Sequence, residues 1–204
     1  MARRSRIALL SCTLLASCGV FARQATMPNC DADRTHVLAL GETQFDQDLA
    51  GGWRALADRP GCILAAADLL RDYRQARKSE AGLLYWHEGQ LRAHAGQTKE
   101  AIALLERARK PAEADRAGWN PYVDATIAFL RKDKPALQEA RSRLAAVPAP
   151  LGQDIPPVID GHVEVDMADG QMRKIPWPPN GDIVDGLLSC FGKPYRQAYG
   201  HDCR

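Results

Sequence analysis

The stretch LLYWHEGQLRAHAGQTKEAIALLERA, residues Leu83–Ala108, predicts two helices joined by a tight turn. Apolar side chains return at helical spacing in its first half, and Gly96 then interrupts the pattern. The second half starts at Thr98, a residue type that caps helices, and continues with a second apolar stripe. Because a helical hairpin this short cannot bury its apolar faces alone, it requires neighbours of the same kind.

The sequence on both sides of this hairpin repeats its pattern. Ala65, Ala101 and Leu137 stand at equivalent positions of three helix pairs, with 36 residues between neighbours. A helical pattern with a period in this range predicts a stack of hairpins. We therefore expect a helical-repeat domain over residues 43–147.

The first pair of this stack has two glycines, Gly51 and Gly52, inside its first helix. Residues 43–58 nevertheless carry one apolar stripe at helical spacing. Its members are Phe45, Leu49, Trp53 and Leu56. The stripe predicts a single continuous helix over this range.

Small residues occur in the central hairpin where its helices would approach, with one large apolar residue among them. These positions are Gly89, Gly96, Ala101, Leu105 and Ala108. In this pattern the hairpin resembles a tetratricopeptide repeat, although Glu88 and Arg92 stand where that motif prefers leucine and an aromatic residue. The resemblance implies antiparallel, closely packed helices. It implies no particular ligand, because one fold serves many functions.

By the same resemblance, the first helix of each pair lines an inner groove that binds a partner. The side chains expected in this groove are Trp86, His87, Gln90, His94 and Tyr122. Trp, Tyr and His combine apolar area with a polar group, which suits contacts to a protein or peptide. The opposing interpretation is that Trp86 and Trp119 belong to the core, since large aromatic side chains are mostly buried.

Residues 1–17 predict an export signal. Three arginines precede an apolar run of 11 residues, which is too short to span a bilayer of roughly 30 Å. Residues 15–18 resemble the bacterial lipobox, which implies cleavage before Cys18, lipidation of its thiol and a membrane tether over residues 18–42. A glycine follows the cysteine, which by the same resemblance favours the outer membrane, facing the periplasm. The alternative is cleavage after Ala22, which would leave a soluble periplasmic protein.

Four cysteines follow Cys18 in the chain. They are Cys30, Cys62, Cys190 and Cys203. An even number in an oxidising compartment predicts two disulfides. Three connectivities are possible, and we favour Cys30–Cys62 with Cys190–Cys203 because each pair lies within one local segment. Zinc binding or redox chemistry is disfavoured, because the sequence contains no Cys-x-x-Cys pair and no zinc-finger spacing.

Residues 148–204 differ in character from the repeats. Val163 and Val165 alternate with acidic residues, and Asp169-Gly170 predicts a tight hairpin turn. A short apolar helix over 182–191 and a tail follow. The expected fold is therefore mostly α, with three stacked tetratricopeptide-like hairpins and a small C-terminal lobe of β-hairpin and helix. We expect this lobe to pack against the last helix pair and cover one end of the stack.

The sequence contains none of the common catalytic motifs. His87 lacks the second histidine, four residues on, of a zinc-protease helix. His162, Glu164 and Asp166 share one face of the predicted strand, near Asp169, so a metal or acid–base site is conceivable there. A solvated outer face of the hairpin is the favoured interpretation, since such faces are routinely charged.

Without the three arginines of the first 17 residues, 24 of the 27 basic residues remain against 25 acidic ones. This near-neutral balance gives no electrostatic argument for binding nucleic acid. We therefore predict a non-catalytic envelope scaffold that binds another protein or peptide and needs no metal or cofactor. The alternative is a periplasmic immunity or inhibitor lipoprotein that neutralises a secreted toxin enzyme. A hydrolase with its site on the hairpin is the least favoured of the three.

Overall fold

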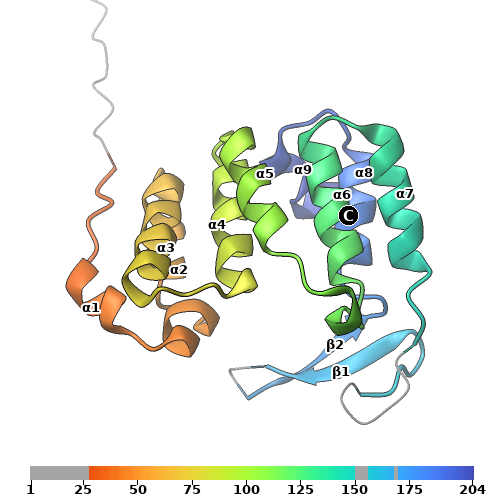
Figure 1. The fold of residues 1–204 in the computed structure, drawn as a ribbon, viewed down its shortest axis with the longest axis horizontal. Helices are drawn as coiled ribbons and strands as arrows, with labels where there is room; N and C mark the ends of the chain where they lie inside the picture. Colours follow the sequence, from red (N-terminus) through yellow and green to blue (C-terminus); the bar gives the residue numbers. More distant parts are fainter. Residues whose placement is uncertain (1–27, 150–155, 168–169) are drawn as a thin grey trace, which may run out of the picture.

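The computed structural model describes residues 28–149, 156–167 and 170–204. Within these ranges the chain is mostly helical, with one antiparallel two-stranded sheet (Figure 1). This confirms the predicted fold class, because packed helix pairs are followed by a β-hairpin and a further helix. The predicted signal peptide, the lipidation residue Cys18 and the turn residue Asp169 lie outside the described residues.

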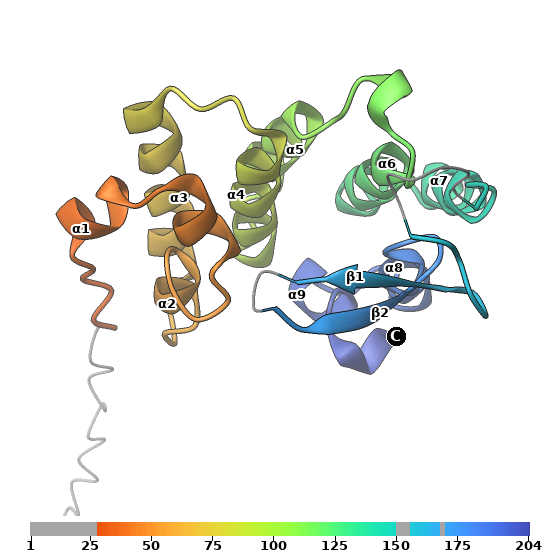
Figure 2. The same cartoon turned by 90° about the horizontal axis from the view of Figure 1, so that it is seen from below.

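The five longest helices stand side by side, with α1–α3 at one end of the molecule and α6–α8 at the other (Figure 1, Figure 2). They are α3 (Ile63–Arg77), α4 (Gly82–His94), α5 (Thr98–Arg107), α6 (Trp119–Leu130) and α7 (Lys134–Ala145). Gly96, at φ +80°, makes the turn from α4 to α5. The predicted cap at Thr98 is wrong, because this residue begins α5 and Gln97 occupies the cap position.

The first pair lacks the continuous helix that its apolar stripe predicts. The chain forms a π-helical turn, η1 (Thr43–Gln47), and then a single helical turn, α2 (Arg54–Ala57). Gly52 separates them in the left-handed conformation, and a Cβ there would lie 2.0 Å from the carbonyl oxygen of Phe45. Only glycine fits so close to a backbone, so the helix is interrupted and Leu49 remains exposed.

Two apolar cores lie on opposite sides of α4. This helix gives Leu84 and Leu91 to the N-terminal core, which also gathers side chains from η1, α2 and α3. It gives Tyr85 and Trp86 to the C-terminal core, which it shares with α5–α8 and α9 (Tyr195–Ala198). The dividing helix therefore belongs to both halves, and neither half is complete without it.

The three equivalent repeat positions do not share one environment. Ala101 and Leu137 are fully buried in the C-terminal core. Ala65 is only partly buried, against the N-terminal core. The period of 36 residues therefore relates positions of equal burial in α5 and α7. In α3 the equivalent position is less buried and belongs to the other core.

The C-terminal lobe begins with the hairpin of β1 (His162–Asp166) and β2 (Met172–Pro176), in which Glu164 pairs with Lys174. Helix α8 (Gly181–Ser189) then packs against α6 and α7, and its apolar face enters the C-terminal core. This confirms the expected contact with the last helix pair. The remaining short helices, which the sequence patterns do not predict, are α1 (Arg34–Ala39), η2 (Ala112–Ala114), α9 and η3 (His201–Cys203).

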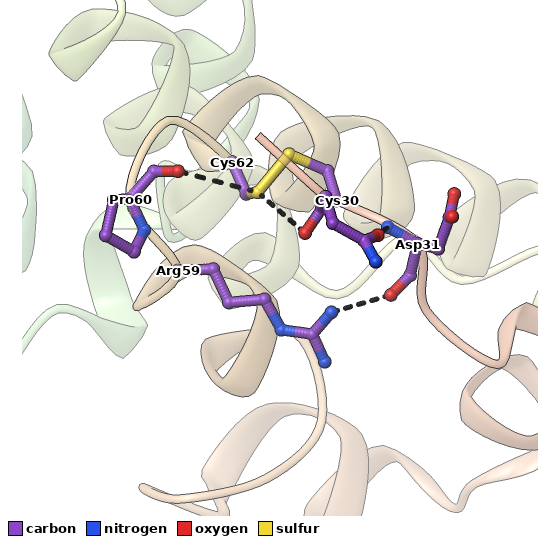
Figure 3. The surroundings of a disulfide bond; sticks show 6 residues. Cys30, Asp31, Arg59, Pro60 and Cys62 are labelled. Atoms are coloured by element: carbon purple, nitrogen blue, oxygen red, sulfur yellow. Dashed lines mark hydrogen bonds between the residues drawn. A yellow bond between two sulfur atoms is a disulfide. The ribbon is translucent and has the colours of Figure 1, made fainter. Parts of the chain in front are cut away.

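Both predicted disulfides are present. Cys30–Cys62 joins the segment before α1 to the start of α3 (Figure 3). Beside it, the Arg59 guanidinium donates a hydrogen bond to the Asp31 carbonyl oxygen at 2.6 Å. Cys190–Cys203 joins the end of α8 to η3. Each bond therefore fixes one end of the described chain to the helix nearest to it.

Candidate functional site

The predicted groove residue His87 faces the N-terminal core. Its Nδ1 lies 2.7 Å from the carboxylate of Asp46, a residue of η1 that is almost fully buried. The Trp53 indole N–H donates to the same carboxylate at 2.9 Å. Burial alone would raise the pKa of Asp46, but hydrogen bonding and charge attraction from His87, with smaller contributions from Trp53 and Arg54, hold that pKa below its ordinary value.

Glu88 and Arg92, the two departures from the repeat motif, meet ionic partners on α3. Glu88 is 2% exposed and accepts hydrogen bonds from both Arg74 and Arg92. Arg92 also donates to Asp68 at 3.0 Å. The interface between α3 and α4 therefore contains a network of ion pairs beside the apolar contacts of Leu84 and Leu91.

Trp86 and Tyr122 are core residues. Their ring centroids are 4.7 Å apart, and Trp119 packs edge-on against Trp86 at 4.9 Å. Trp86 is 3% exposed and Tyr122 is 2% exposed, so neither offers contact area to a partner in this structure. The structure therefore places Trp86 in the core, as the opposing interpretation of the sequence expects.

The inner face between the two complete hairpins is filled by the protein's own C-terminal segment. Tyr195 and Tyr199 place their ring centroids 5.2 and 5.8 Å from the ring of His94. The hydroxyls of Tyr199 and Tyr122 lie 3.1 Å apart. Burial raises the pKa of Tyr195 well above its ordinary value, and the side chain of Gln90 opposes part of that shift.

The five predicted groove residues therefore have intramolecular neighbours. His87 contacts the N-terminal core, Trp86 and Tyr122 belong to the C-terminal core, and Gln90 and His94 contact α9. The sequence patterns miss the two tyrosines that occupy this face. The two tyrosines are four residues apart and directly follow Pro194, which is typical of one helical turn. Cys203, four residues after Tyr199, can fix this turn through a disulfide. Together these features could have indicated an ordered helical turn.

The outer face of the β-hairpin carries a different site. A cavity of about 570 Å³ lies between this face and the segment 156–160. Two exposed apolar side chains line it, Ile159 at 65% and Met172 at 56% exposure. Its charged and titratable side chains are Asp160, His162, Glu164, Asp166 and Lys174.

The strand register explains why these side chains gather on one face. Val163 is buried and pairs with the half-buried Ile175, so the alternate positions of both strands point outward. Lys174 approaches Glu164, with 3.7 Å between ammonium nitrogen and carboxylate oxygen. The described residues contain no group of three side chains arranged to hold a metal ion. The arrangement is suited to contact with a partner that is partly apolar and partly charged.

No protein-family model, no curated protein and no solved structure matches this chain. The resemblance of the central hairpin to a tetratricopeptide repeat therefore remains a prediction.

Proposed function

We propose that this protein is a non-catalytic scaffold that binds an extended segment of another protein on the outer face of its β-hairpin. The observation that carries the proposal is the cavity of about 570 Å³ with Ile159 and Met172 exposed along it. Exposed apolar groups beside polar ones are typical of protein interaction sites. The inner face predicted from the sequence is a weaker candidate, because α9 fills it.

The charges of this face support a basic partner. Asp160, Glu164 and Asp166 contribute three carboxylates, and Lys174 contributes one ammonium group. Complementary charge increases the rate of encounter and disfavours wrong partners. The partner segment is therefore expected to combine lysine or arginine with apolar side chains. The carboxylates are exposed to solvent, which agrees with binding and gives no support to acid–base chemistry.

The proposed place of action is the bacterial envelope. The N-terminal sequence predicts export and lipidation of Cys18, and the two disulfides are consistent with an oxidising, extracytoplasmic compartment. In the ranges that the structure covers, no helix has both the length and the apolarity needed to cross a membrane. Palmitate labelling that is lost in Cys18→Ser tests the proposed anchor.

Site-specific crosslinking in the native cells tests the binding site. A photoreactive residue replaces Met172 in one variant and Leu64 in another, because Leu64 is an exposed apolar residue on α3 at 40% exposure. We expect the probe at 172 to capture a partner segment rich in basic and apolar residues, and the probe at 64 to miss it. A synthetic peptide of that segment should bind the full-length protein, and Ile159→Ser/Met172→Ser should weaken its binding at least tenfold.

The matched control is Leu64→Ser/Leu83→Ser, which removes two exposed leucines outside the cavity and should leave peptide binding unchanged. The proposal fails if both probe positions capture the same proteins, or if neither captures one. It also fails if the double variant at the hairpin binds the peptide as tightly as the unaltered protein does.

A further inference from the structure

Three interhelical turns meet at the end of the molecule opposite the β-hairpin (Figure 1). They connect α4 to α5, α6 to α7, and α8 to α9. A cavity of about 190 Å³ lies between them, lined by residues of all three turns, including Gly96, Lys132 and Gly192. Because the three turns are far apart in the sequence, only the packed fold forms this cavity.

The charged side chains that line this cavity are both cationic. Lys132 comes from the α6–α7 turn and Lys193 from the α8–α9 turn. No aspartate or glutamate lines the cavity, and neither lysine has an ion-pair partner within the described ranges. An anion in the cavity would be attracted by the positive charge of both lysines.

Two further groups at the cavity can donate hydrogen bonds to an anion. Thr98 contributes a hydroxyl and His94 an imidazole ring. Burial, together with the positive charge of Arg196, lowers the pKa of His94 below its ordinary value of 6.5. The neutral ring keeps one N–H donor. Tyr195 packs against His94, and because burial raises its pKa well above the ordinary value, it contributes no negative charge there at neutral pH.

We propose that this cavity binds a small oxyanion, either phosphate or the carboxylate at the end of a peptide chain. Lysine ammonium groups with hydroxyl and imidazole donors are the chemistry that recognises such groups. Sites for drug-sized ligands measure roughly 300–1,000 Å³. The smaller cavity therefore fits a free anion or one terminal group of a longer molecule. The site lies apart from the hairpin face and does not depend on the function proposed for it.

Calorimetric titration of the full-length protein in detergent, at low ionic strength, tests this proposal. The probes are inorganic phosphate, N-acetylalanine, which has a free carboxylate, and N-acetylalaninamide, which has none. We expect saturable binding of phosphate, N-acetylalanine or both, and no binding of the amide. The bound anion should shift the NMR signals of the Gly96 and Gly192 amides and of the His94 ring. The response to the two anions shows which source of the oxyanion the site accepts.

The test variant Lys132→Gln/Lys193→Gln should weaken anion binding at least tenfold. Lys78→Gln/Lys110→Gln removes the same charge from two exposed lysines outside the cavity, and binding should be unchanged. The proposal is overturned if neither anion binds, or if sodium chloride at equal ionic strength gives the same response. It is also overturned if the two double variants behave alike.

Discussion

The two sides of α4 show how one helix can join its neighbours by different chemistry. On the side of α3, Glu88 and Arg92 form ion pairs with Arg74 and Asp68. On the side of α6, Trp86 packs against aromatic rings, and α9 adds more. The first interface combines these ion pairs with apolar contacts of Leu84 and Leu91, whereas the second consists mainly of packed aromatic area.

This difference has consequences for stability. A buried carboxylate depends on its partners, because removing one partner leaves an uncompensated charge in a poorly solvated place. When a side chain of an aromatic cluster is truncated, the protein loses stability in proportion to the apolar area removed. No buried charge is left without a partner. The N-terminal interface should therefore be the more sensitive of the two to the loss of a single ionic group.

The largest effect is expected for Glu88→Ala. This change leaves the guanidinium groups of Arg74 and Arg92 without their shared carboxylate, and should cost about 3–5 kcal/mol of the unfolding free energy. Urea unfolding followed by circular dichroism measures the loss. The control is Glu80→Ala, whose side chain is 73% exposed and pairs with Arg107, for an expected cost below about 1 kcal/mol. Equal costs would show that charge does not hold the α3–α4 interface.

The second prediction compares the two disulfides. Cys30–Cys62 closes a loop of 32 residues and Cys190–Cys203 one of 13. On the chain-entropy account, their removal as alanine pairs should cost about 3.7 and about 2.9 kcal/mol respectively. Unfolding of the two double variants in urea gives both values. A larger loss at the C-terminal pair would mean that the disulfide also orders α9 against the inner face.

The smallest predicted effect is a dependence of the unfolding free energy on pH, which should differ between the two halves of the molecule. His94 has a pKa below 6.5 in the folded protein, so the stability that its neutral form contributes is present above pH 6.5 and is lost as pH falls through the lowered value. Asp46 has a pKa below 3.8, so its contribution is present above pH 3.8 and is lost only in stronger acid.

Urea unfolding at pH 8, 5 and 3 measures both steps. We expect His94→Gln to flatten the loss between pH 8 and 5, and Asp46→Asn to flatten the loss between pH 5 and 3. If His94→Gln leaves the first step unchanged, the step arises from another group, and His94 does not couple the C-terminal segment to pH.

Several features could be predicted from the sequence because they depend on local chemistry. Helical spacing predicts the α4–α5 hairpin and α8 to within a few residues, and strand alternation predicts the β-hairpin. The cysteine positions favour the two observed pairings. The interruption of the first pair could not be predicted from apolar spacing alone. It follows from the backbone of Gly52, which lies against the carbonyl of Phe45.

The candidate sites were less predictable, because they depend on contacts between distant segments. The sequence shows that His162, Glu164 and Asp166 share a strand face, but only the fold places Ile159 and Met172 beside them. The groove side chains are identifiable by type, and nothing local shows that Tyr195 and Tyr199 will cover them.

The sequence by itself therefore determined the longer helices and the β-hairpin and favoured the two disulfides that form, since neighbours in the chain set those outcomes. Only the tertiary structure decided which helix faces remain open. A side chain at a groove position becomes a core residue when a segment 77 positions away, such as Tyr199 for Tyr122, packs against it. The gain from burying that aromatic area is a property of the whole fold, and no local pattern encodes it.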